Sequence, residues 1–153
     1  MLNNTKAYLE ECLRQFNNQD ETHHRFHVRT LGILTFAVTI FSLAIRWMQE
    51  PLSMAEQNAI FLMAITLSLA IFLGVSILMP STWSRPIKLN RLREYLPESE
   101  ESLTLKMADI YKKSVNHNWE IVDRMGSQML FLTIFVSFEL VVFICLHVHP
   151  FLG

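Results

Sequence analysis

One acidic residue, Glu139, lies inside a hydrophobic run near the end of the chain, where residues 135–143 read FVSFELVVF. A carboxylate at the centre of a membrane helix costs roughly 2.5–3.5 kcal/mol, unless a proton, a cation or water reduces that cost. Ionisable residues in such places mark ion or proton paths, or contacts that hold an assembly together. Nothing near Glu139 in the sequence completes a catalytic site, so we interpret it as an assembly or gating residue.

Arg46 is the candidate partner of Glu139. The triplet Thr-Ile-Phe occurs in both surrounding apolar runs, at residues 39–41 and 133–135. If the two triplets lie at one depth in a membrane, Glu139 is level with Ile45, next to Arg46. We therefore predict that Arg46 and Glu139 interact, within one chain or between two subunits. In the alternative, Arg46 extends to the lipid headgroups and Glu139 is protonated.

The histidines of the stretch HHRFH have part of the spacing of a metal site. His23 and His27 are four residues apart on one helical face, and Asp20 lies one turn earlier. A metal ion needs three or four converging ligands, and a wet basic turn explains the same residues, so we predict no metal and no cofactor. The phosphate-loop, dinucleotide-binding, nucleophile-elbow and zinc-protease motifs do not occur, and the sequence does not predict an enzyme.

Three long stretches nearly free of charge position these residues. Apolar residues make up 51% of the 153-residue chain and charged residues 18%, a balance typical of membrane proteins. A membrane-crossing helix needs about 20 apolar residues. We predict an all-α integral membrane protein with three transmembrane helices, at residues 30–48, 58–79 and 129–147.

The basic residues predict the orientation of these helices. Four of the 13 Lys and Arg residues precede the first span, eight lie between the second and third, and Arg46 is the remaining one. The positive-inside rule then places residues 1–29 and 80–128 in the cytoplasm. The short loop 49–57 and the tail 148–153 lie outside. A net charge of −1 gives no reason to expect nucleic acid as a partner.

The cytoplasmic segments are predicted to be mainly helical. Residues 5–28 have an apolar stripe, and NNQD at 17–20 is the most favourable place for a break. A long helix is expected to begin in PESEES and to run into the third span, so that helices 1 and 3 extend into a cytoplasmic stalk. In the cytoplasmic segment that follows the second span, a short helix is expected to carry Lys88, Arg91 and Arg93. This helix either contacts lipid headgroups or is a plain connector.

Small and hydroxyl side chains are regularly spaced in the three spans. Thr35, Thr39 and Ser42 share a face with Arg46, and Thr133 shares one with Ser137, from which Glu139 points about 200° away. Each of these two hydroxyl faces either lines a pore or packs against another helix. Small residues at intervals of four allow helices to approach each other closely. The second span has such a series: Thr66, Ala70 and Gly74.

Two further motifs carry a resemblance to a known class of proteins. The loop PSTWSRP follows the second span, and the last helix contains Tyr111, Ser114 and Asn118 in the pattern Y-x-x-S-x-x-x-N. With three spans and a cytoplasmic stalk, this architecture resembles the small multi-span effectors of bacterial antiphage systems, of the SLATT and cyclic-nucleotide-triggered types. The resemblance implies a homo-oligomer that perturbs or depolarises the membrane. It transfers no catalytic or ligand-binding residue.

Two other functions are compatible with the same sequence. In the first alternative, the chain is a non-conducting anchor or regulatory subunit that recruits a cytoplasmic protein partner through its cytoplasmic helices. In the second it is a proton-coupled carrier that uses Glu139, but three spans without broken helices or repeated halves disfavour that possibility. The lipid bilayer is a partner in every case.

Overall fold

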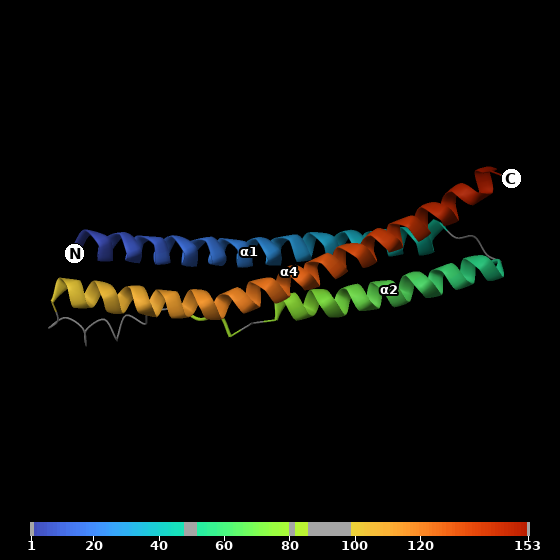
Figure 1. Cartoon of the computed structure of the whole chain (residues 1–153). Helices are drawn as coiled ribbons and strands as arrows, with labels where there is room; N and C mark the ends of the chain where they lie inside the picture. The colour runs from blue at the N-terminus through green and yellow to red at the C-terminus, as the bar shows by residue number, and fades with distance from the viewer. Residues whose placement is uncertain (1, 48–51, 80–81, 86–98, 153) are drawn as a thin grey trace. The chain divides into compact units, whose positions relative to one another are not determined.

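The computed structural model describes residues 2–47, 52–79, 82–85 and 99–152. Its regular elements in these ranges are the α-helices α1 (Leu2–Trp47), α2 (Met54–Leu78) and α4 (Glu100–Leu152), shown in Figure 1. Each helix is long and apolar enough to cross a membrane. The predicted all-α class is therefore confirmed, with a membrane-compatible helix at each of the three predicted places.

Helix α1 continues without a break through NNQD at 17–20, as the predicted extension of the first span into a stalk requires. The helix boundaries differ from the predicted ones in two ways. Helix α2 begins four residues before residue 58, because Ser53 and Glu56 form a capping box: the Ser53 hydroxyl accepts from the Glu56 N–H, and the Glu56 carboxylate accepts from the Ser53 N–H. Helix α4 continues to Leu152, through most of the expected tail. The predicted surface helix with Lys88, Arg91 and Arg93 lies outside the described residues.

The chain divides into two compact units. We call residues 1–25 and 80–124 the polar unit, and residues 26–79 and 125–153 the apolar unit. Helices α1 and α4 contribute to both units, whereas α2 belongs to the apolar unit alone.

In the polar unit, α1 and α4 are parallel and pack along a seam. Lys6 pairs with Glu100 at 2.7 Å, and further along the ring of Phe16 contacts that of Tyr111 at 5.7 Å. Buried and half-buried residues recur at alternating steps of three and four, the period of a coiled coil. They are Leu9, Cys12, Phe16, Gln19 and His23 on α1, and Thr104, Ala108, Tyr111, Val115, Asn118 and Val122 on α4.

In the apolar unit, α1 and α4 pack along a seam of the same period, and α2 packs against the pair in the opposite direction. The seam residues are Phe26, Thr30, Ile33, Ala37, Ile40 and Ala44 on α1, and Met125, Met129, Leu132, Val136, Glu139 and Phe143 on α4. The hydroxyl of Thr30 donates to Met129 Sδ at 3.2 Å. Gly74 of α2 lies against Leu34, whereas Met63, earlier in α2, packs with Ile40 and Ala44 near the end of α1.

Candidate functional site

Glu139 occupies a seam position of α4 and is completely buried, with 0% of its surface exposed. Neither carboxylate oxygen has a hydrogen-bond partner among the described residues. The residues beside it in the sequence, Leu140 and Val142, pack on the apolar core of the unit. Burying a polar group without a partner is unfavourable, so this carboxyl group is an energetically costly feature of the apolar unit.

Arg46 lies on the outer side of α1 and is exposed. It follows Ala44 of the seam by two residues, which turns it about 200° away from the core. Its neighbour Trp47 contacts Phe143, one turn beyond Glu139, with ring centroids 5.9 Å apart. This contact places Arg46 about one helical turn from Glu139 along the helix pair, and a common depth of the two charges in a membrane stays a prediction. No hydrogen bond joins them within the chain, and a pair between subunits stays a prediction.

The predicted hydroxyl face of α1 lies outside the three-helix core. Thr35, Thr39 and Ser42 are all exposed. Each hydroxyl donates to the carbonyl oxygen four residues earlier, at distances of 2.9, 2.8 and 2.7 Å. Because these bonds satisfy the hydroxyl donors, the face is stable against lipid as well as against water or another helix.

Thr133 and Ser137 of α4 lie on the rim of a shallow groove beside α1. The groove has a volume of about 270 Å³ and is lined by Gly32, Ile33, Phe36, Thr133, Val136, Ser137 and Leu140. Ser137 is exposed and Glu139 is buried, as the predicted angle between them requires. The apolar unit therefore has a polar outer face and a separate buried acid.

The small residues of α2 lie on its inner face. Thr66, Ala70 and Gly74 are all buried. The Thr66 hydroxyl donates to the carbonyl oxygen of Met63 at 2.9 Å, so it needs no partner on another helix. These three residues are placed where close helix packing needs small side chains.

The two motifs behind the family resemblance contact each other in the polar unit. The N–H of Ser84 donates to Asn118 Oδ1 at 2.9 Å, and Asn118 Nδ2 donates to the Ser84 carbonyl oxygen at 3.1 Å. The hydroxyls of Ser84 and Ser114 are hydrogen-bonded at 3.1 Å. Asn118 is fully buried, and both halves of its amide are used on one residue. We call residues 82–85 the strap.

Two histidines complete the attachment of the strap. The Nε2 of His117 lies 3.0 Å from the carbonyl oxygen of Thr82 and donates to it in the tautomer protonated there. The ring of His23 on α1 stacks on Trp83, with centroids 4.4 Å apart. The strap therefore contacts both α1 and α4. Among the described residues, no three His, Cys, Asp or Glu side chains lie together in a way that would hold a metal ion.

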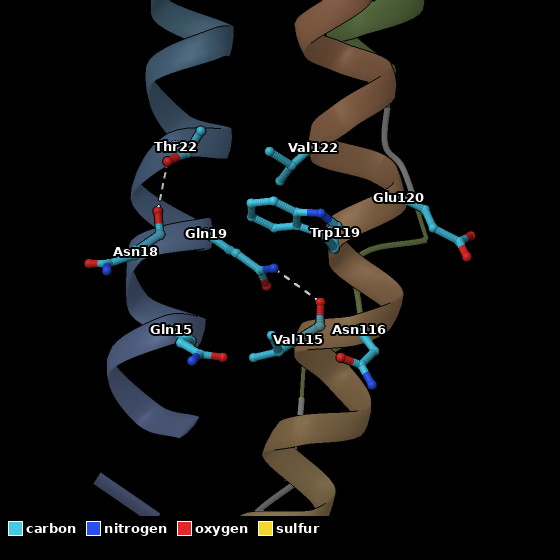
Figure 2. Close-up of a pocket in the computed structure, with 9 residues that line it drawn as sticks. All are labelled: Gln15, Asn18, Gln19, Thr22, Val115, Asn116, Trp119, Glu120 and Val122. Carbon is cyan, nitrogen blue, oxygen red and sulfur yellow. Dashed lines mark hydrogen bonds between the residues drawn. The ribbon is translucent and has the colours of Figure 1, made fainter. Parts of the chain in front are cut away.

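An open groove between α1 and α4 is a second feature of the polar unit. It has a volume of about 750 Å³ and is lined by Gln15, Asn18, Gln19, Thr22, Val115, Asn116, Trp119, Glu120 and Val122. Figure 2 shows the Trp119 ring reaching from α4 toward α1, next to the Gln19 amide, while Glu120 points away. Trp119 is 56% exposed. Gln19 Nε2 donates to the Val115 carbonyl oxygen at 3.0 Å, but the buried Oε1 has no partner among the described residues.

The sequence interpretation missed both the strap contacts and the groove. Asn118 carries one signal, because a polar Asn at a seam position of a coiled coil is retained for a specific contact. Trp119 carries another, since it is a large aromatic residue in a polar stretch. No protein-family model matches the chain, and neither a curated protein nor a solved structure is significantly similar to it.

Proposed function

We propose that this chain is an integral membrane protein of the bacterial inner membrane that assembles from several copies and forms or gates a pore. The three long apolar helices support insertion into a bilayer. With the N-terminus in the cytoplasm and the C-terminus outside, the polar unit faces the cytoplasm, where most of the basic residues lie.

The burial of Glu139 is the observation on which the proposal rests. Its buried, unpartnered carboxyl group is costly in one copy, and membrane proteins keep such residues for ion pathways, proton relays or assembly. Met63, Ala70 and Leu132, all without exposed surface, fill the core of a single chain. A water path therefore needs several copies, with the face of Thr35, Thr39, Ser42 and Arg46 turned toward a neighbour or toward the pore.

A cytoplasmic protein partner is the proposed trigger. The groove that contains Trp119 offers it a docking surface on the α1–α4 pair, and an exposed tryptophan is a frequent anchor of protein interfaces. Together with the resemblance to antiphage effectors, this supports a role as a defence effector that disturbs the membrane once its partner signals infection.

Membrane potential tests this function directly. The protein is expressed in a bacterial host at graded levels while a potential-sensitive dye is followed. We expect depolarisation by the wild type and its loss in Glu139→Gln. Glu10→Gln, the same substitution at an exposed site of α1, is the matched control and should depolarise like the wild type. An unchanged potential at every expression level contradicts a pore that opens without its partner.

A non-conducting anchor or regulatory subunit is the second candidate, and the groove beside Trp119 favours it. In that case the potential stays unchanged, while a soluble partner copurifies with the full chain. Trp119→Ser then releases the partner, whereas Trp47→Ser, at the far end of α1, does not. Retention of the partner by Trp119→Ser contradicts this use of the groove.

A further inference from the structure

We infer that the open groove of the polar unit is a contact surface for a second copy of this chain, and that each copy packs its Trp119 side chain on the groove of the other. The inference rests on the proposed assembly from several copies, and it gives the groove a resting occupant. The cytoplasmic partner then reaches the groove only by displacing the neighbouring copy.

The groove is the uncovered side of the α1–α4 pair in the polar unit. The strap contacts Ser114 and Asn118, whereas Asn116 and Trp119 line the groove. At about 100° per residue, Trp119 lies about 140° around α4 from Ser114, and the seam residues Val115 and Asn118 lie between them. Trp119 is 56% exposed, so the described part of the chain leaves this side of the seam open.

Gln19 shows what the open side lacks. Its side chain is 96% buried, because only 4% of the residue is exposed, and its Nε2 donates to the Val115 carbonyl oxygen at 3.0 Å. The Oε1 has no partner among the described residues, and the amide lies in the groove next to the Trp119 ring (Figure 2). A buried acceptor without a donor is unfavourable, so an occupant that brings a donor is favoured here. An indole N–H is such a donor.

The chemistry of the groove suits an identical surface. Of its nine lining residues only Glu120 is charged, and Glu120 points away (Figure 2). Two such surfaces therefore meet without the like-charge repulsion that disfavours the self-association of a charged patch. An amide is both a donor and an acceptor, so it can pair with the same amide of another copy. The amide residues of the groove are Gln15, Asn18, Gln19 and Asn116.

A two-fold axis parallel to α1 and α4 of the polar unit relates the two copies in this arrangement, as in a parallel coiled coil. Rotation about such an axis leaves each residue at its own level. Gln19 bonds to Val115, one turn of α4 before Trp119, so Gln19 and Trp119 lie within about one turn of the same level. Trp119 of each copy therefore meets the groove of the other near Gln19, and the contact forms twice.

Cross-linking of identical copies tests the inference. The full chain is made in detergent without its native cysteines (Cys12→Ala and Cys145→Ser), and a short bismaleimide is added. Asn18→Cys, in the groove, is compared with Asn17→Cys, its exposed neighbour, which does not line the groove. We expect Asn18→Cys to form the covalent dimer at least tenfold faster. Equal rates assign the groove to the cytoplasmic partner alone and overturn the inference.

Substitution of Trp119 is a second, independent measurement. Trp119→Ser should raise the dissociation constant between copies about tenfold or more, because it removes the aromatic anchor. Trp119→Phe keeps a ring but loses the N–H, and should raise it about fivefold. Glu120→Ser, at the adjacent residue, is the control and should leave it unchanged. Sedimentation equilibrium in detergent measures the constant, and circular dichroism checks that the helices are intact. An unchanged constant in Trp119→Ser contradicts the inference.

Depolarisation separates this contact from the proposed function. If Asn18→Cys is cross-linked selectively while the wild type leaves the membrane potential unchanged, a pore that opens without its partner is contradicted and the contact between copies stands. If the wild type depolarises while Asn17→Cys and Asn18→Cys are cross-linked at equal rates, the inference is wrong and the proposed pore stands.

Discussion

Gly74 of α2 lies directly against the side chain of Leu34 of α1. A Cβ atom at residue 74 would come within 2.5 Å of Leu34 Cδ1. Gly32, two residues before Leu34 in α1, is the opposite case, because a Cβ atom there would meet nothing within 4 Å. Two glycines of the apolar unit thus have opposite roles: one permits close packing, and the other only lowers helix propensity.

These two glycines should respond oppositely to the same substitution. Gly74→Ala forces Leu34 to move and is expected to destabilise the protein by about 1–2 kcal/mol, as overpacking does. Gly32→Ala should stabilise it by about 0.5–1 kcal/mol, because alanine is the better helix former. Circular dichroism during unfolding in detergent measures both. Equal effects would mean that α2 does not pack on Leu34.

Replacing Glu139 with leucine should separate stability from function. The substitution removes a buried polar group that has no partner, so the free energy of unfolding should rise by about 1–3 kcal/mol. The same variant should no longer depolarise membranes. If Glu139→Leu is less stable than the wild type, the carboxyl group has a favourable partner in the assembled protein.

The predicted pairing of Arg46 with Glu139 is tested by exchanging the charges. Arg46→Glu and Glu139→Arg should each reduce the fraction of oligomer in detergent, because each places like charges together. The double variant should recover most of it, as measured by native mass spectrometry. A double variant no better than either single one contradicts the pair, within a chain and between chains.

Glu11 should titrate at unusually low pH. Its carboxylate accepts two hydrogen bonds from Arg14 and one from Gln15, all at 2.8 Å. These bonds favour the charged form, and hold the pKa of Glu11 at about 2, against an ordinary value of 4.5. The pairing is thus present above the ordinary pKa and is lost as the pH falls through about 2. NMR titration measures this, and Arg14→Met should raise the pKa. A wild-type value near 4.5 would show that Arg14 and Gln15 do not hold the carboxylate in solution.

Local sequence patterns predicted the fold and the faces of its helices. Charge-free runs identified the three apolar helices because a bilayer requires continuous apolar length. The fixed rotation per residue of a helix correctly predicted that Glu139 and Ser137 face different ways. Boundaries were less accurate, since the start of α2 depends on the capping pair of Ser53 and Glu56 rather than on hydrophobicity.

Contacts between distant segments were not predictable in the same way. Ser84 and Asn118 are 34 residues apart, and hydrogen bonds between a backbone and a distant amide leave no periodic trace in the sequence. His23 was interpreted as part of a wet basic turn, but its actual neighbour is Trp83. Both misses concern side chains whose partners come from elsewhere in the chain.

The parallel pairing of α1 with α4 has a consequence for biosynthesis. Thr30 and Met129, which meet on the seam, are separated by 99 residues, and Gln19 and Val115 by 96. A ribosome adds about 5–20 residues per second, so α1 waits roughly 5–20 s for its partner after it has been made. During that interval its seam has no helix to pack against, and neighbouring nascent chains compete for it. Slower translation of the segment between α2 and α4 should therefore increase aggregation rather than help folding.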